Sequence, residues 1–346
     1  MARPPKFKIL AIDGGGIRGV VPLQVIRYIE SVTKKEIHQS FDLIAGTSTG
    51  GILSSALTIQ DKNSVEADTR KYTLDKLESI YKDRGKEIFP APSKFVKWYT
   101  FCKSWIQPQF DPKGLNEVLK EYFGEERISN CLKPIFIASY DIHRNKPVFF
   151  TYREASLFAD RNPTLVEIAR ATSAAPTYFP TYDFHYASER LICIDGGIYM
   201  NNPSLGVLVE VLGNADYKHY KLNNKVLQMK DIALLSLGTG HTNSLVDGIR
   251  ANGWGKFRWI KPVIDLSTNG PVKVIDNQIE TIFKSFSLDS NYLRVDIYIK
   301  NRYSEMSDVR DSTIDYLIKE AQSQILNNDT MRSKIDIFLR EAGLID

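Results

Sequence analysis

Residues 41–59 read FDLIAGTSTGGILSSALTI: an apolar run, then a turn of glycine, serine and threonine, then a stretch that suits a helix. Residues 8–19 read KILAIDGGGIRG and repeat this order, with a strand expected at 8–12 before the glycines and a helix expected at 20–31 after them. Successive strand–turn–helix units are typical of α/β proteins whose central sheet is mostly parallel. These two stretches therefore predict the fold class.

The same alternation continues along the chain. Further helices are expected at residues 51–59, 113–122, 165–171, 204–212, 311–325 and 333–341. Further strands are expected at residues 41–45, 134–139, 147–151, 191–194, 232–236 and 292–299. The sequence shows no internal repeat, low-complexity tract or linker, so we expect residues 1–346 to form one α/β domain.

Composition excludes several classes of protein. The 346 residues are 43% hydrophobic and 25% charged, which is ordinary for a globular chain and unlike a disordered or fibrous one. A net charge of +4 is too small for a protein that coats a nucleic-acid polymer. Three scattered cysteines do not form a disulfide framework or a zinc site. The first residues lack the features of a signal peptide, so we expect a cytoplasmic protein.

The turn in the first stretch has the pattern GxSxG, formed by Gly46, Ser48 and Gly50. A serine between a strand and a helix in this pattern is typical of a nucleophile elbow, in which a sharp turn lifts the hydroxyl out at the start of the helix. The alternative is a plain loop rich in serine, threonine and glycine.

The glycine turn that follows the first strand has two interpretations. Gly14, Gly16 and Gly19 satisfy GxGxxG between a strand and a helix, which is the fingerprint of a dinucleotide site. Consecutive glycines also allow backbone amides to converge on an anion, as in an oxyanion hole. The motif alone does not distinguish these two sites from a tight structural turn.

A general base for Ser48 has two candidates. His241 follows a Leu-Gly-Thr-Gly turn, but a histidine in such a loop is more often simply solvated. Asp195 ends an apolar strand and precedes Gly196 and Gly197, so a carboxylate stands at the carboxyl end of a strand with space beside it. An ordinary Asp-Gly turn would read the same way.

Taken together, these motifs resemble the patatin-like phospholipase family. The resemblance rests on DGGGIRG at 13–19, GTSTG at 46–50, DGG at 195–197 and ATSAAPTYFP at 171–180, in that order. It covers residues 7–215 and becomes weak over 216–346, which we expect to be the C-terminal part of the same domain.

The resemblance implies a three-layer α/β/α fold with a catalytic dyad of Ser48 and Asp195. Ser48 would be the nucleophile and Asp195 its base in the hydrolysis of fatty-acyl esters of membrane phospholipids. The glycine turn of Gly14, Gly15 and Gly16 would form the oxyanion hole, with Arg18 beside it. We expect no nicotinamide, no metal ion and no other cofactor.

One segment has the composition of a membrane contact. Residues 84–107 contain five basic residues and one acid, with Phe95, Trp98, Tyr99 and Trp105 at helical spacing. Such a segment suits a lid or an anchor on an anionic inner membrane. It equally suits a helix that packs its aromatic side chains on the core. Residues 252–259, with Trp254 and Trp259, pose the same choice.

Within the family, the short chain resembles the phospholipase effectors of cyclic-oligonucleotide antiphage systems, which implies a cyclic dinucleotide as activator. A constitutive housekeeping lipase or lysophospholipase has the same architecture. An acyl transferase using the same elbow is the alternative chemistry, and a ligand-binding module that has lost activity is the non-enzymatic one. The sequence does not determine which glycerol position, head group or chain length the enzyme prefers. It also leaves open whether the chain forms a homo-oligomer.

Overall fold

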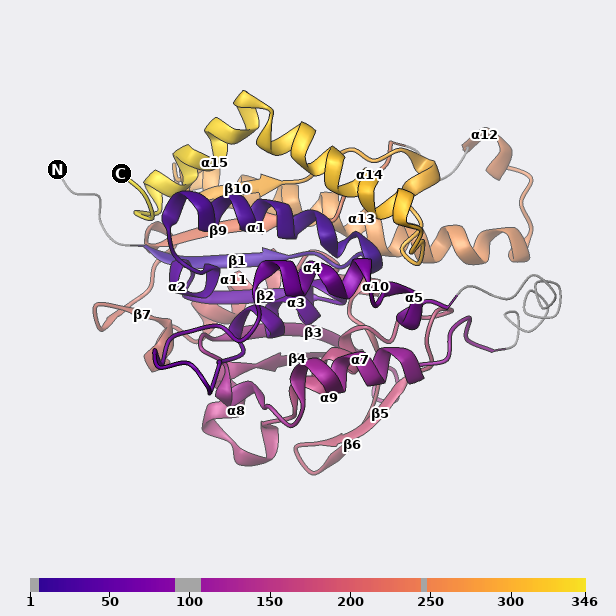
Figure 1. Cartoon of the computed structure of the whole chain (residues 1–346), viewed down its shortest axis with the longest axis horizontal. Helices are drawn as coiled ribbons and strands as arrows, with labels where there is room; N and C mark the ends of the chain where they lie inside the picture. The colour runs from indigo at the N-terminus through magenta and orange to yellow at the C-terminus, as the bar shows by residue number, and fades with distance from the viewer. Residues whose placement is uncertain (1–5, 91–106, 244–247) are drawn as a thin grey trace.

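The computed structural model describes residues 6–90, 107–243 and 248–346 (Figure 1). The strands are β1 Phe7–Ile12, β2 Leu43–Thr47, β3 Ile135–Asp141, β4 Lys146–Thr151, β5 Tyr182–Tyr186, β6 Glu189–Asp195, β7 Lys221–Leu222, β8 Lys225–Val226, β9 Ile232–Leu237 and β10 Tyr292–Val295. The helices are α1 Val20–Thr33, α2 Ile37–Ser40, α3 Thr49–Thr58, α4 Leu74–Lys82, α5 Gly85–Ile88, α7 Lys113–Phe123, α8 Tyr152–Leu157, α9 Leu165–Thr172, α10 Gly197–Met200, α11 Ser204–Gly213, α12 Gly248–Ala251, α13 Lys256–Ser285, α14 Asp311–Ala321 and α15 Asp329–Glu341.

The central sheet is mostly parallel, as predicted. Its strand order is β10-β9-β1-β2-β3-β6-β5, and β4 also pairs with β3. The strands from β10 to β3 run parallel to their neighbours, whereas β4, β5 and β6 pair in the antiparallel sense. Strands β7 and β8 form a separate hairpin.

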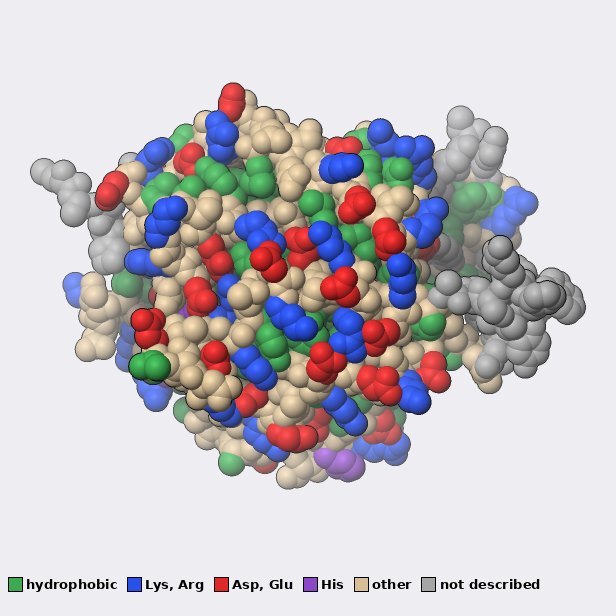
Figure 2. All heavy atoms as spheres, viewed as in Figure 1, with side chains coloured by type: hydrophobic (Ala, Val, Ile, Leu, Met, Phe, Trp, Pro, Cys, Tyr) green, Lys and Arg blue, Asp and Glu red, His purple; other side chains and the backbone are tan. Residues whose placement is uncertain are grey.

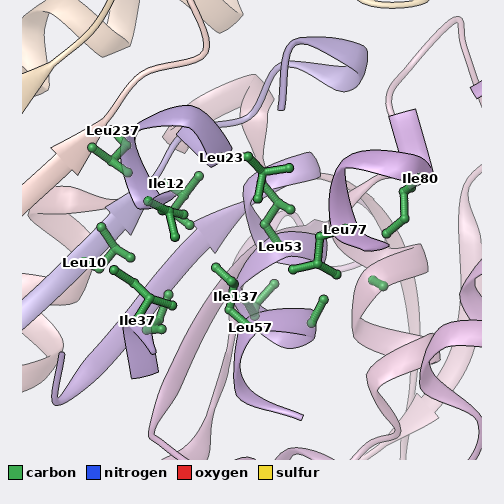
Figure 3. Close-up of a cluster of buried hydrophobic side chains, with 14 of the residues drawn as sticks. Leu10, Ile12, Leu23, Ile37, Leu53, Leu57, Leu77, Ile80, Ile137 and Leu237 are labelled. Atoms are coloured by element: carbon green, nitrogen blue, oxygen red, sulfur yellow. The ribbon is translucent and has the colours of Figure 1, made fainter. Parts of the chain in front are cut away.

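Both faces of the sheet are covered by helices. Side chains alternate along β1, so that Leu10 and Ile12 belong to one buried cluster while Ile9 and Ala11 belong to another. The first cluster packs under α1, α3, α4, α9, α14 and α15. Figure 3 shows the part of it to which Leu23 of α1, Leu53 of α3 and Leu77 of α4 belong. The second packs under α11 and α13. These layers confirm the predicted three-layer α/β/α fold.

The pairing of β3 places the ends of two other strands side by side. Ala138 pairs with Thr47 of β2 on one edge of β3, and the next residue, Ser139, pairs with Asp195 of β6. Strand β4 occupies the opposite edge of β3 along its length. Strand β6 therefore continues the edge that β2 leaves, and the last residues of β2 and β6 meet there.

The turn from β2 into α3 crosses other backbone segments closely. A Cβ atom on Gly46 would lie 2.2 Å from the Gly50 carbonyl oxygen, and one on Gly50 would lie 2.2 Å from the Ile12 carbonyl oxygen. Both contacts are with backbone atoms, which cannot rotate away as a side chain can. The two glycines of the GxSxG pattern are therefore required by packing.

Several elements differ from the sequence prediction. The strand expected at 292–299 ends at Val295, and the helix expected at 311–325 is α-helical only to Ala321, after which a π-helical turn follows. Helix α13 and strand β5 were not predicted. Within the described residues, no helix combines the length and the apolar character needed to cross a bilayer.

We predict that Gly50→Ala lowers the free energy of unfolding by about 3 kcal/mol, because the added methyl group forces two backbone segments apart. Gly213→Ala is the matched control, since a Cβ atom there meets no atom within 4 Å. The control should leave stability unchanged or raise it by about 0.5 kcal/mol. Urea denaturation of the purified proteins measures both, and equal stabilities for the two variants would contradict the packing argument.

Candidate active site

Ser48 lies between β2 and α3 in a backbone conformation that L-residues rarely adopt. Its φ is 54° and its ψ is −124°, so the residue is strained. Its amide donates a hydrogen bond to Thr172 Oγ1 at 2.8 Å, and the same hydroxyl donates to the Ala138 carbonyl at 2.6 Å. Thr172 thus connects the turn to β3 and holds Ser48 in its strained conformation.

The structure brings Ser48 and Asp195 together across 147 residues of sequence. Ser48 Oγ donates to Asp195 Oδ2 at 2.6 Å, and the Gly197 amide donates to Asp195 Oδ1 at 2.7 Å. Asp195 is only 6% exposed. Burial raises the pKa of Asp195 to about 6, although the hydrogen bonds from Ser48 and Gly197 favour the ionised form. A carboxylate with this pKa is a stronger base than an ordinary aspartate and is still ionised at neutral pH.

Ser48 and Asp195 line a narrow apolar cavity of about 90 Å³. Its other walls are mostly apolar and come from α3, α4, α5 and the segment after α9, with Ile52, Ile80, Ile88, Phe89, Tyr178 and Phe179 among them. The ring of Phe89 packs on Phe110 and Phe179 at centroid distances of 5.3 and 5.6 Å. A hydrocarbon chain is the kind of ligand that such walls bind.

The peptide planes of the glycine turn are fixed from behind. The Gly14 carbonyl accepts hydrogen bonds from Thr239 Oγ1 at 2.7 Å and from Asn201 Nδ2 at 3.3 Å. The Gly15 carbonyl accepts from the Arg18 amide at 3.2 Å and from Arg18 Nε at 3.3 Å. The N–H of a trans peptide points away from its C=O, so the Gly15 amide points away from Thr239 and the Gly16 amide away from Arg18.

Only part of the predicted oxyanion hole is free to bind an anion. The Gly14 amide donates to the Asn201 carbonyl at 3.1 Å, so it is already engaged. The amides of Gly15 and Gly16 donate to no acceptor among the described residues, and Gly16 lines the Ser48 cavity. Arg18 is buried beside the turn, but its side chain lines a different cavity. Its contact with the turn is through the Gly15 carbonyl.

A buried ion pair anchors the turn to the sheet. Asp13, which precedes the glycines, accepts hydrogen bonds from Arg294 Nη1 at 2.9 Å and Nη2 at 2.6 Å. Burial raises the pKa of Asp13 to about 6, although Arg294 favours its ionised form. Arg294 also contacts Asp296 at 3.3 Å. Removing Arg294 would leave the buried Asp13 without its cationic partner, whereas removing Asp13 would leave Arg294 paired with Asp296 alone.

His241 is part of this second group and not of the Ser48 cavity. It lines a polar cavity of about 620 Å³ together with Arg18, Asp13 and Arg294. Its Nδ1 lies 3.1 Å from Asp296 Oδ2. The structure therefore places Asp195, and not His241, next to Ser48.

Two other sequence predictions concern the aromatic segment and a metal ion. Phe95, Trp98, Tyr99 and Trp105 lie outside the described residues. Within the described part of the chain, no three residues of the His, Cys, Asp and Glu types are grouped so as to hold a metal ion.

Comparisons with known proteins point to one family. A sequence model described as patatin-like phospholipase matches residues 10–208. Patatin-like protein 3 of Arabidopsis thaliana is 30% identical over 321 residues, which cover 85% of this chain and 75% of the relative. Patatin-04/09 of Solanum tuberosum is 30% identical over 334 residues, which cover 91% of this chain and 82% of the relative.

The chain belongs to the patatin-like phospholipase family. Members of this family are lipid acyl hydrolases, so the protein is an enzyme of that type and a lipid is its substrate. The apolar cavity beside Ser48 is consistent with that substrate.

Sequence reasoning missed the residues that support this patatin-like site. Thr172 lies in the ATSAAPTYFP segment and Thr239 in the Leu-Gly-Thr-Gly turn, and neither pattern by itself gives its threonine a role. Both threonines use their hydroxyls to hold backbone groups, and no local pattern marks such a use. Arg294 lies in a strand that carried no motif, so nothing in the sequence connected it with Asp13.

Proposed function

We propose that Ser48 is the nucleophile and Asp195 the general base of an enzyme that hydrolyses fatty-acyl esters of membrane phospholipids. The hydrogen bond of 2.6 Å between Ser48 Oγ and Asp195 Oδ2 carries the proposal. The strained backbone of Ser48 and the apolar cavity that both residues line support it. Family membership supplies the lipid acyl hydrolase chemistry.

The reaction uses Asp195 twice. Ser48 Oγ attacks the ester carbonyl while its proton passes to Asp195 Oδ2, and a tetrahedral oxyanion forms. When the intermediate collapses, the bond to the alkoxide oxygen breaks, and Asp195 returns the proton to the departing lysolipid. A water molecule then attacks the acyl-enzyme and gives its proton to Asp195. When this second intermediate collapses, the bond between the acyl carbon and Ser48 Oγ breaks, Asp195 returns the proton to Ser48 Oγ, and the fatty acid leaves.

We assign the oxyanion hole to the amides of Gly15 and Gly16. Both lack acceptors among the described residues, and the carbonyl of the same peptide group is held on the opposite side in each case. An amide that is fixed before the reaction stabilises the developing charge without first having to reorient, and one such donor contributes about 3 kcal/mol. Thr239 and Arg18 are positioning residues in this scheme, because they act through the peptide planes.

Two further features of the sequence resemblance remain predictions. Activation by a cyclic dinucleotide and a role in antiphage defence are tested by measuring phospholipid hydrolysis with and without a panel of cyclic dinucleotides. An acyl transferase is distinguished in the same assay by adding a thiol or alcohol acceptor and identifying the product.

We predict that Ser48→Ala abolishes hydrolysis of a soluble short-chain ester, and that Asp195→Asn lowers kcat at least about a thousandfold, because the nucleophile loses its base. Urea denaturation should show both variants folded. His241→Ala is the control and should keep most of the activity. If His241→Ala were as damaging as Asp195→Asn, a histidine would be the base and the dyad would be wrong.

The pKa of about 6 for Asp195 sets the pH dependence. Since the base must be ionised, kcat/KM for a neutral soluble ester should rise with pH up to about 6 and then level off. At pH 5 the rate should be about tenfold below the plateau. Asp13 has a pKa that is also about 6, so Asp13→Asn is the control. The residual activity of Asp13→Asn should show the same midpoint in its pH profile. If that midpoint disappears in the variant, the titration belongs to Asp13 and not to Asp195.

Thr239→Val should lower kcat about tenfold with little change in KM for a soluble ester. The substitution removes the hydroxyl that holds the Gly14 carbonyl, so the Gly15 amide loses its fixed direction. Thr239→Ser keeps the hydroxyl and should restore kcat. A merely structural role for Thr239 would instead lower stability in urea without this separation of kcat from KM.

A further inference from the structure

Helix α13 consists of two parts with different surroundings. From Ile275 to its end, the helix buries Ile275, Ile279 and Phe283 in the cluster beneath the sheet. From Lys256 to Val274, no side chain that the structure describes is buried. The first part of α13 and helix α12 extend beyond α5 at the right of Figure 1. This part of α13 therefore contacts the rest of the described chain only through half-buried side chains, and its other described side chains are exposed.

The exposed part presents an apolar stripe. Ile260, Val263 and Val274 are 47%, 50% and 55% exposed. At 3.6 residues per turn, their spacings place them within about 60° of one another around the helix axis. Trp259, one residue before Ile260, packs edge-on against Trp254 with ring centroids 5.4 Å apart. Exposed apolar side chains aligned in this way are typical of a contact surface.

The charge of this part is strongly one-sided. Residues 256–274 include a single acid, Asp265, against four bases, Lys256, Arg258, Lys261 and Lys273. Lys256, Arg258 and Lys273 are exposed. By contrast, acidic and basic side chains are interspersed over the face shown in Figure 2. An excess of bases beside an apolar stripe matches an anionic lipid surface, which offers both negative head groups and hydrocarbon.

The position of α13 connects this surface with the active site. Helix α10, which begins two residues after Asp195, packs against α13. The polar cavity next to the glycine turn is also lined by α13, through Leu266, Asn269 and Lys273. The exposed part of α13 therefore adjoins the edge of the sheet that carries Ser48 and Asp195.

We propose that the exposed part of α13 docks the enzyme on anionic lipid bilayers, through a docking surface formed by Ile260, Val263 and Val274 with Lys256 and Lys273. The apolar side chains insert among the head groups while the bases contact lipid phosphates. The inference rests on the proposed phospholipid substrate, because docking at this edge brings the apolar cavity next to the bilayer.

Binding to vesicles tests the proposal in the Ser48→Ala background, which prevents hydrolysis of the lipid. The vesicles are phosphatidylcholine, with or without about one third phosphatidylglycerol. The apolar variant Ile260→Asp/Val263→Asp should bind the anionic vesicles at least about tenfold more weakly. The charge variant Lys256→Glu/Lys273→Glu should lose about fivefold for each base removed. Binding of the parent protein should also weaken as NaCl is raised from about 0.1 M to 1 M.

Ile337→Asp is the matched control, because Ile337 is 51% exposed on α15. It should bind vesicles like the parent protein. With Ser48 restored, the apolar variant should hydrolyse a soluble short-chain ester at the normal rate, which separates a failure of docking from a failure of the proposed chemistry. The charge variant changes only exposed side chains, so it keeps the test valid if the apolar variant does not fold.

Unchanged vesicle binding in both α13 variants would overturn the proposal. So would equal losses in the Ile337→Asp control. If the α13 variants instead convert an oligomer to a monomer in sedimentation and still bind vesicles, the surface joins two copies of the chain and the membrane assignment is wrong.

Discussion

The site depends on the way two strands share one edge of β3. Strand β2 pairs with β3 as far as Ala138, and β6 takes the next position at Ser139. This succession places the residue after β2 beside the last residue of β6, although 147 residues separate Ser48 from Asp195. A shift of either strand by one residue would turn its side chains to the other face of the sheet. The register of β3 therefore places Ser48, the proposed nucleophile, beside Asp195, its proposed base.

The glycine turn shows how polar groups can be oriented by interactions on their far side. An amide that is to bind a transient anion must be left without a partner, yet an unpaired amide has no bond to hold its direction. In this structure the direction comes from the carbonyl of the same peptide, which Thr239 holds in one case and Arg18 in the other. The Asp13–Arg294 pair adds a charged anchor one residue earlier. Burying that pair has a desolvation penalty, and in return the pair holds the start of the glycine turn in place.

Much of this arrangement follows from local sequence. The strands and helices around Gly46–Gly50 and Gly14–Gly16 are predictable because an apolar run, a glycine-rich turn and a helical stretch follow one another directly. Ser48 and Asp195 could be named for the same reason. Helix α13 could not, because Pro262 and Pro271 interrupt a pattern that the fold nevertheless keeps helical.

The supporting residues of the site were not predictable from the sequence, and the reason is physical. Arg294 reaches Asp13 across β9, and its Nη1 also donates to Ser236 Oγ of that strand at 2.8 Å. This contact exists only because β9 lies between β1 and β10 in the sheet. The hydroxyls of Thr172 and Thr239 likewise serve backbone groups far away in sequence. Their roles depend on the assembled sheet, which no motif encodes.

Burial is what would let a single aspartate serve as the base in the proposed dyad. In water an aspartate has a pKa near about 3.9 and removes a proton from an alcohol poorly. Burial raises the pKa of Asp195 to about 6, and the Gly197 amide keeps the carboxylate ionised and oriented. At pH 7 about nine in ten molecules would then carry the ionised base, by the ordinary titration relation. A higher pKa would make a stronger base but leave less of it ionised, so burial and hydrogen bonding together set the balance between base strength and the ionised fraction. A hydrocarbon chain in the apolar cavity would exclude still more water from the carboxylate.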